Sequence, residues 1–172
     1  MMNPPYQEPL LELTKRRQFK NILEVGFGYG FSADIWLRTG AHVTSVDKGD
    51  WADKPIGEQF TFIQGDSKEV LPTLTGKYDL IFIDGDHTYG GCKQDILNAL
   101  PLLAKNGIIL LDDYGVEGFS GGVDFEIDGR VIDGEYGVRK AAEETLQDFQ
   151  QVYEDIKFAN GGRAYAPKSR VG

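Results

Sequence analysis

Acidic side chains and a histidine follow two apolar runs of this sequence. Asp84 ends the run YDLIFID and precedes His87 by three residues, while Asp112 and Asp113 end the run GIILLDD. If the two runs form neighbouring strands, their ends lie about 5 Å apart at one edge of a sheet. Carboxylates this close repel one another unless one is protonated or a cation joins them. Oxygen ligands favour a hard cation, so these residues predict a site for Mg²⁺ or another hard divalent ion.

A glycine-rich segment, EVGFGYG at 24–30, lies between an apolar run and a helical pattern. Glycines allow positive φ angles and let a ligand approach the bare backbone, and the following helix offers free N–H groups. A dinucleotide-binding fingerprint would have its third glycine at position 31, which is Phe31 here. No Lys-Ser/Thr pair follows, which excludes a phosphate-binding P-loop. The segment therefore predicts a binding loop of another kind.

The elements that must position these residues alternate along the chain. Short apolar runs predict strands, and segments with helical spacing lie between them. The strands are expected at 21–25, 42–47, 60–64, 78–84 and 107–113, and the helices at 31–40, 67–74 and 92–103. This alternation predicts a parallel α/β sheet with right-handed crossovers. Ligands of such sheets bind at the carboxyl ends of the strands, where the acids and the glycines stand.

The two ends of the chain are less regular. Residues 1–9 hold three prolines and predict a loose lead-in before a short helix at 10–19. The glycine-rich segment 115–137 interrupts the alternation, and FEIDGRVI within it predicts a hairpin turning at Asp128-Gly129. This insertion could be a lid, a dimer contact or a mobile loop. A helix at 138–149 and two strands near 152–158 and 163–167 are expected to close one domain that spans residues 1–172.

Composition and charge exclude several classes of protein. The chain has 27 acidic and 18 basic residues, and its net charge of −9 repels nucleic acid. No run approaches the roughly 20 apolar residues of a membrane span, and no secretory signal is expected. The single cysteine, Cys92, excludes an internal disulfide. A cytoplasmic protein with no membrane partner is the expectation.

The glycine segment, with an acid before it, resembles the first motif of class I S-adenosylmethionine-dependent methyltransferases. Further acids follow in the order of that family across residues 20–167, nearly the whole chain. The resemblance implies a Rossmann-like three-layer α/β/α fold with a mostly parallel seven-stranded sheet and an antiparallel last strand. It also implies that adenosylmethionine is the cofactor and that Asp47 accepts hydrogen bonds from the ribose hydroxyls. The cofactor-binding residues it implies are Glu24, Gly26, Phe27, Gly28, Gly30, Asp47, Lys48, Gly65, Asp66, Ser67 and Asp84.

The second group of acids resembles the metal-dependent O-methyltransferases of the catechol and caffeoyl-CoA type. Matched to that family, Asp84, Asp112 and Asp113 would hold the divalent ion. His87 stands where those enzymes place a general-base lysine, and a branch with macrolide sugar O-methyltransferases also has histidine there. The resemblance thus implies that Asp84 and His87 are catalytic and that a sugar or polyol hydroxyl of a small molecule is methylated. A homodimer is a further expectation.

Several alternatives remain open at the level of the sequence. The glycines could serve only a tight turn, Asp66 could only cap a helix, and His87 could be an outer hydrogen-bonding group. Trp51 could lie against an adenine or simply pack. The chain could be a non-catalytic or metal-independent adenosylmethionine-binding module, since only about 20 residues precede the first strand where many relatives carry substrate-covering helices. An NAD-dependent oxidoreductase is the remote alternative, because an acid at position 47 also suits NAD.

Overall fold

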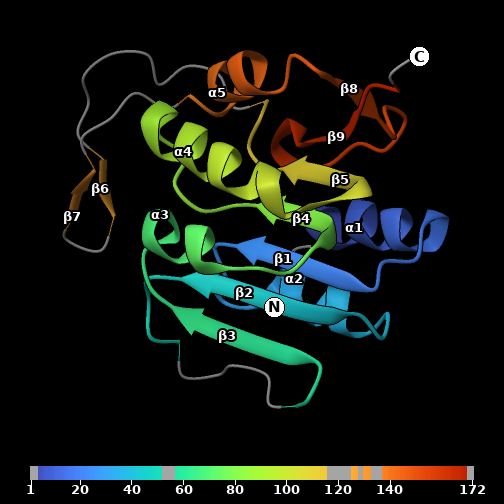
Figure 1. The fold of residues 1–172 in the computed structure, drawn as a ribbon, viewed down its shortest axis with the longest axis horizontal. Coiled ribbons are helices and arrows are strands. Elements are labelled where there is room, and N and C mark those ends of the chain that lie inside the picture. The colour runs from blue at the N-terminus through green and yellow to red at the C-terminus, as the bar shows by residue number, and fades with distance from the viewer. Residues whose placement is uncertain (1–3, 52–56, 116–124, 128–129, 133–136, 170–172) are drawn as a thin grey trace.

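Seven strands form one sheet at the centre of the molecule (Figure 1). The computed structural model describes residues 4–51, 57–115, 125–127, 130–132 and 137–169. The strands are β1 (Asn21–Val25), β2 (His42–Asp47), β3 (Phe60–Gln64), β4 (Tyr78–Ile83), β5 (Leu103–Leu111), β8 (Phe149–Val152) and β9 (Arg163–Pro167). They lie in the order β3-β2-β1-β4-β5-β9-β8, and the first five are parallel. β9 runs antiparallel to both of its neighbours. The predicted fold class is confirmed.

Helices cover both faces of the sheet. They are α1 (Pro4–Arg16), α2 (Phe31–Leu37), α3 (Ser67–Val70), α4 (Tyr89–Ala99) and α5 (Val138–Thr145), with 3₁₀ turns η1 (Leu71–Thr73), η2 (Leu100–Leu102) and η3 (Ala159–Gly161). Figure 1 shows α4 in front of the sheet and α2 behind it. None of the helices in the described part of the chain has the length and apolar character needed to cross a membrane.

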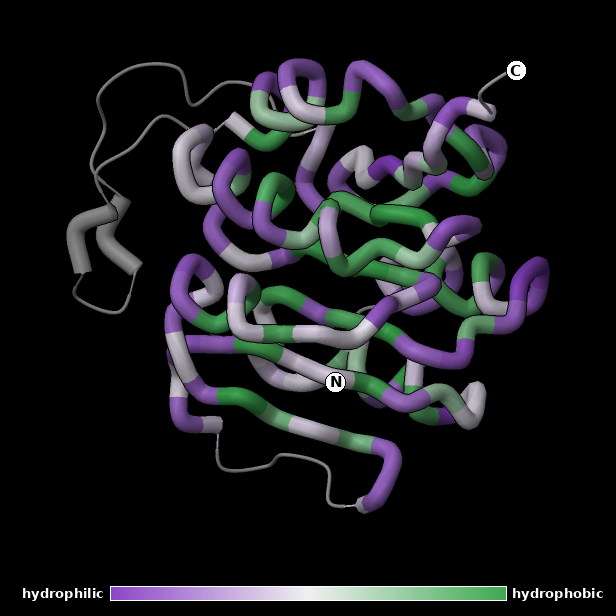
Figure 2. Tube along the Cα trace, viewed as in Figure 1, coloured by the Kyte–Doolittle hydropathy of each residue, from purple (hydrophilic) through white to green (hydrophobic). Residues whose placement is uncertain are grey.

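The central strands are buried on both faces, which explains their continuous apolar sequences. Leu80 and Ile81 are neighbours in β4, but Leu80 packs in the cluster under α1 and α2, and Ile81 packs in the cluster under α4 and α5. Figure 2 shows the resulting apolar centre and the polar residues around it. The apolar clusters on the two faces hold the central strands in place. The candidate site residues directly follow the carboxyl ends of these strands.

The N-terminal segment differs from the prediction of a loose lead-in over residues 1–9. Helix α1 already begins at Pro4 and contains Pro9. Pro4 and Pro5 lie in the first turn, where proline is tolerated because the N–H groups there have no partner inside the helix. Burial of Leu10 and Leu13 against the sheet supplies the stabilisation that the proline-rich sequence lacks. Residues 1–3 lie outside the described part.

The strand expected at 152–158 is also displaced. The structure has β8 at Phe149–Val152, and α5 ends at Thr145 instead of 149. Antiparallel pairing explains the shift, because Phe149 is the partner of Pro167 in β9 and packs against the core. Tertiary pairing here overrides the helical pattern of the local sequence.

The insertion at 115–137 is described only in part. Strands β6 (Phe125–Ile127) and β7 (Arg130–Ile132) pair antiparallel, as the hairpin prediction required. Their turn at Asp128-Gly129 and the rest of the insertion, apart from Gly115 and Gly137, lie outside the described residues. The predicted role of the insertion stays a prediction.

Candidate active site

The site lies where the strand order changes direction. The chain runs from β1 through β2 to β3 on one side and then returns to β4 on the other side of β1. Such a switch point opens a crevice at the carboxyl ends of the strands. Gly26 follows β1 and Asp84 follows β4, and a Cβ atom on Gly26 would lie 2.1 Å from the carbonyl oxygen of Asp84. The glycine loop and the acidic cluster are therefore direct neighbours.

The loop adopts a conformation that only glycine readily allows. The φ angles of Gly26 and Gly28 are +92° and +52°, in a region disfavoured for residues with a side chain. The N–H group of Gly26 donates to the carbonyl oxygen of Val46 at 2.9 Å, which ties the loop to β2. Bare backbone at the switch point is what a closely approaching ligand requires.

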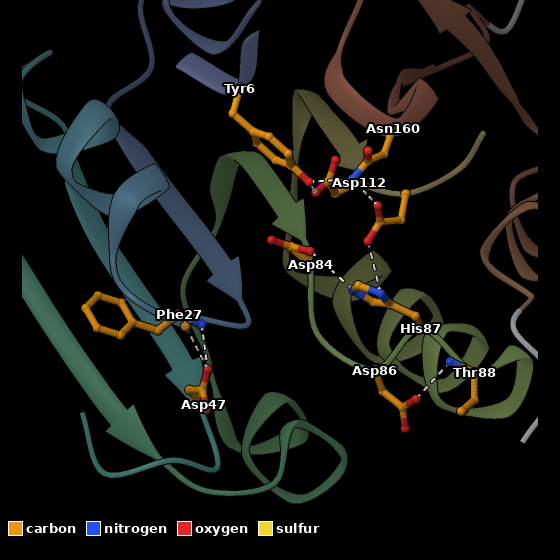
Figure 3. A network of polar contacts seen from close by, with 11 residues as sticks. Tyr6, Phe27, Asp47, Asp84, Asp86, His87, Thr88, Asp112 and Asn160 are labelled. Carbon is orange, nitrogen blue, oxygen red and sulfur yellow. Dashed lines mark hydrogen bonds and ion pairs between the residues drawn. The ribbon is translucent and has the colours of Figure 1, made fainter. Parts of the chain in front are cut away.

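Asp47 holds this loop from the end of β2. Its Oδ2 atom accepts hydrogen bonds from the N–H groups of Phe27 at 2.8 Å and Gly28 at 3.0 Å (Figure 3). Its Oδ1 atom accepts a third from Gly49 at 2.7 Å. Burial opposes ionisation, but these donors hold the pKa of Asp47 below its ordinary value. Asp47 is therefore ionised at neutral pH, and its carboxylate lies beside the loop.

Glu24 lies beneath the loop and is fully buried. Its carboxylate accepts hydrogen bonds from the hydroxyl groups of Ser32 and Ser45, the latter at 2.6 Å. Burial raises the pKa of Glu24 to about 7 against the effect of these two donors. Glu24 therefore ties β1 to α2 and β2 beneath the loop, and its predicted contact with the cofactor stays a prediction.

Glu24 makes stability depend on pH, because its pKa is about 7 in the fold and 4.5 ordinarily. The folded chain binds more protons there, so this group's stabilisation is complete below pH 4.5 and lost as the pH rises through 7. Glu24→Gln removes the titration. As the pH rises from 4.5 to 8, the free energy of unfolding of the variant should increase relative to that of wild type by on the order of 3 kcal/mol, as measured by urea unfolding. The exposed Glu58→Gln is the control, and equal pH slopes for all three proteins would contradict the prediction.

A second set of predicted cofactor residues follows β3. Asp66 accepts from the Lys68 N–H at 3.0 Å and so caps α3, as one of the alternatives proposed. The Lys48 ammonium group lies 3.0 Å from the other Asp66 oxygen. The Ser67 hydroxyl donates to the buried carboxylate of Asp95 at 2.5 Å. Because the Gly65 N–H donates to the Asp47 carbonyl oxygen at 2.8 Å, this turn adjoins the loop site.

Trp51 packs beside the loop. Its ring lies 5.4 Å from the ring of Tyr29, centroid to centroid, in an edge-to-face arrangement. Tyr29 is 80% exposed, so this pair of rings reaches the molecular surface beside the loop. The ring of Phe27, by contrast, is buried against Phe60 and Phe62, so Phe27 serves the site through its backbone N–H.

The acids after β4 and β5 converge around His87. Ile83 and Leu111 are register partners, so Asp84 and Asp112 follow neighbouring strand ends as predicted. The Nε2 atom of His87 lies 3.3 Å from Asp84, and its Nδ1 atom lies 3.0 Å from Asp113 (Figure 3). Ligand atoms of Asp84, His87 and Asp113 all lie within 4.8 Å of one another. The geometry can hold a metal ion.

The electrostatics of the cluster show an excess of negative charge. Burial and the charges of Asp84 and Asp113 raise the pKa of Asp112 to about 8. Burial and the charge of Asp113 also raise the pKa of Asp84, although His87 opposes them. Burial would lower the pKa of His87, but the carboxylates of Asp113 and Asp84 raise it to about 10. A partly buried cluster of this charge is suited to a cation, so its donors fit a hard divalent ion.

The structure adds two residues to this cluster that the sequence analysis missed. The Tyr6 hydroxyl, from α1, donates to Oδ2 of Asp112 at 3.0 Å. The Asn160 amide, from η3, donates to Oδ1 of Asp113 at 2.5 Å. No local motif marks either position, although the Asn-Gly-Gly text at 160–162 is a turn signal. The group that could hold a metal also contains His87, whereas the predicted set had Asp112 in its place.

The fold and the site together define a Rossmann-like domain with a glycine loop and an acidic cluster at its switch point. Comparison with protein families identifies the particular class. The model of a family described as "Methyltransferase domain" matches residues 23–114, more than half of the chain, and the chain belongs to this family. The match includes the glycine loop and every predicted acid. The resemblance to class I S-adenosylmethionine-dependent methyltransferases is confirmed.

Curated relatives share part of their length with this chain. Polyprotein P1234 of Alphavirus salmon subtype 1 is 29% identical over 117 residues, which cover 61% of this chain. O-methyltransferase hkm8 of Aspergillus hancockii is 29% identical over 108 residues, which cover 55% of this chain. The chain spans 4% of the polyprotein and 42% of hkm8. The likeness is therefore to a segment of each relative.

Solved structures show the same fold. The O-methyltransferase TomG of Streptomyces achromogenes, solved with SAM, superposes with a TM-score of 0.69 at 20% identity over 97% of this chain and 81% of TomG. MycE from the mycinamycin pathway, solved with Mg, SAH and mycinamycin VI, has a TM-score of 0.52 at 18% identity. That superposition covers 64% of this chain and 32% of MycE. At these identities the likeness concerns the fold.

Proposed function

We propose that this protein is an S-adenosylmethionine-dependent O-methyltransferase that acts on a hydroxyl of a small molecule, with the help of a divalent cation. One observation carries the proposal. The glycine loop that suits the cofactor and the carboxylate cluster that suits a cation meet at the contact between Gly26 and Asp84. A methyl donor and an activated acceptor must be this close for transfer to occur.

The cofactor end of the site uses backbone and carboxylate groups. The backbone of the loop 26–30 would lie against the methionine part of adenosylmethionine, and Asp47 would accept hydrogen bonds from the ribose hydroxyls. Lys48, Asp66 and Ser67 would line the adenine end. The SAM in TomG, which shares this fold, supports the choice of cofactor.

The acceptor end must supply a nucleophilic oxygen. In the transfer an oxygen–carbon bond forms as the sulfur–carbon bond of the sulfonium breaks, and the hydroxyl loses its proton. Nδ1 of His87 is held by Asp113 at 3.0 Å, while Nε2 makes the longer 3.3 Å contact, so Nε2 is the atom that we assign to accept this proton. A base oriented in this way by a carboxylate is a recurring arrangement.

The residues that would hold the cation are Asp84, Asp112 and Asp113, with His87 at its side. A divalent ion bound there would offset the negative charge that raises the pKa of His87 and would lower the pKa of a hydroxyl bound to it. The ends of β4 and β5 position these three carboxylates, and burial of Asp112 and Asp113 limits the access of water to two of them. The Mg in MycE supports a cation at such a site.

A sugar or polyol is the substrate class that we propose. The mycinamycin VI in the MycE structure supports a small-molecule acceptor. The net charge of −9 and the acidic site disfavour nucleic acid and other polyanions. A soluble cytoplasmic enzyme without a membrane partner, and with a second copy as its partner, completes the proposal.

Calorimetric titration tests the proposal. We expect adenosylmethionine to bind the wild-type protein, and Mg²⁺ to bind with it. Asp47→Ala should weaken adenosylmethionine binding by about 10- to 100-fold, because hydrogen bonds to a charged group contribute about 1.5–3 kcal/mol. Glu58→Gln, an exposed change away from the loop, should bind as wild type does. Heat from NAD(H) and none from adenosylmethionine would retire the proposal in favour of an oxidoreductase.

A further inference from the structure

A continuous chain of hydrogen bonds surrounds the carboxylate cluster and joins four distant segments. It begins at Asp112, which accepts from the hydroxyl of Tyr6 at 3.0 Å. The Tyr6 oxygen accepts from the Asn160 amide at 2.6 Å, and the same amide nitrogen donates to Asp113 at 2.5 Å. Asp113 then contacts His87 at 3.0 Å. Tyr6 and Asn160 come from α1 and η3, outside the region 23–114 that the family model matches.

The hydrogen-bonding capacity of the two outer residues is directed at the acids. The amide nitrogen of Asn160 has two hydrogens, and it contacts both Tyr6 and Asp113. The hydroxyl of Tyr6 has one hydrogen, and it is donated to Asp112. Figure 3 shows Tyr6 and Asn160 meeting over Asp112 from opposite sides. Both neighbouring acids are thus held through one shared contact.

The backbone at Asp113 is supported by the same neighbours as its side chain. Asp113 has a φ angle of +54°, in the left-handed region that disfavours residues with a side chain. Asp and Asn adopt this region more readily than other residues with a side chain, and contacts with the surroundings stabilise them there. Asn160 has a φ angle of +52°, and its carbonyl oxygen accepts from the Gly115 N–H at 2.9 Å. η3 therefore contacts the turn that follows β5 in two ways. One contact joins the two backbones, and the other joins the side chains of Asn160 and Asp113.

We infer that Tyr6 and Asn160 are positioning residues that hold the carboxylates of Asp112 and Asp113 in the orientation that a divalent cation requires. This inference rests on the proposed function. It assigns to α1 a part in the site, because α1 delivers the hydroxyl that fixes Asp112. Outer hydrogen-bonding partners of this kind orient ligands, and their loss lowers metal affinity by about 10- to 100-fold.

Two variants remove the contacts and leave the packing intact. Tyr6→Phe deletes only the hydroxyl, and the ring still lines an apolar hollow with Leu10, Phe82 and Phe158. Asn160→Gly deletes the amide, and glycine accepts the φ angle of +52°. Tyr89→Phe is the matched control, because the Tyr89 hydroxyl donates to Glu144 in a separate network between α4 and α5.

The measurement is the affinity of the protein for Mn²⁺, followed by electron paramagnetic resonance, with adenosylmethionine affinity and the unfolding temperature recorded in parallel. We expect Tyr6→Phe and Asn160→Gly each to weaken Mn²⁺ binding by about 10-fold or more. The double variant should lose little more than either single variant, because the two act as one unit. Adenosylmethionine affinity should stay within about twofold of wild type, and Tyr89→Phe should match wild type throughout.

Three results would overturn the inference, and they differ in whether the proposed function falls with it. Wild-type Mn²⁺ affinity in both single variants would show that Tyr6 and Asn160 do not position the ligands, while the metal-assisted function would stand. A wild-type protein that binds adenosylmethionine and no Mn²⁺ would remove the cation from the function and the inference with it. A fall in unfolding temperature with unchanged Mn²⁺ affinity would assign the pair a purely structural role.

Discussion

Replacing His87 with alanine should lower the rate of methyl transfer by about 10²- to 10⁴-fold, the range that a positioned general base contributes. Adenosylmethionine affinity should remain within about twofold of wild type, because the His87 ring is held by the acids after β4 and β5, at the acceptor end of the site. The measurement is single-turnover transfer from labelled adenosylmethionine to an accepted polyol, beside calorimetric titration of the cofactor.

The other histidine of the chain provides the control. His42 lies exposed at the start of β2, at the opposite end of the strand from Asp47, and His42→Ala should transfer methyl groups at the wild-type rate. Undiminished transfer by His87→Ala would show that the proton leaves by another route. The assignment of the cofactor would survive that result, whereas the assignment of the base would not.

Gly26→Ala should disrupt both halves of the site at once. The new Cβ atom would lie 2.1 Å from the carbonyl oxygen of Asp84 and 2.9 Å from the Gly85 nitrogen, and both are backbone atoms that cannot rotate away. The φ angle of +92° adds conformational strain. We expect a loss of about 2 to 6 kcal/mol in the free energy of unfolding, from strain and overpacking together. Displacement of Asp84 should also slow transfer by about 100-fold.

Gly28→Ala separates these two causes. Gly28 also has a positive φ angle, but a Cβ atom added there would have no heavy atom of the described residues within 4 Å, apart from its own chain neighbours. The variant should therefore lose only the conformational part, about 1 to 2 kcal/mol. Urea unfolding of both variants gives the comparison. If the two lose the same stability, the contact between the loop and Asp84 is not as close as the structure shows.

Much of the fold follows from short-range sequence patterns. The strands β1, β2 and β3 were predicted with the bounds that the structure has, because each is a short run rich in apolar and β-branched residues with glycine or charged residues close to its ends. The meeting of Asp84 with Asp112 was also predictable, since parallel neighbouring strands end at one edge. Residue type and spacing were sufficient for these features.

Patterns were misleading where pairing or packing with distant segments decided the outcome. The helical pattern at 138–149 extends to the first residue of β8, but Phe149 pairs with Pro167 of β9 and belongs to the sheet. The prolines of α1 suggest a loose segment, but the burial of Leu13 stabilises a helix there. In both cases contacts with segments that are distant in the sequence outweigh the local propensity.

The candidate site divides in the same way. Strand-end positions predicted the glycine loop and the acids after β4 and β5 as site residues, and the family resemblance added Asp47, because these residues sit next to the elements that position them. The direction in which a carboxylate points depends on the layers around it, so only the structure shows Glu24 turned inward to Ser32 and Ser45. The contact between Tyr6 and Asn160 joins residues 154 positions apart. No local pattern encodes such a contact, because it exists only once α1 and the turn before β9 have packed against the same strand end.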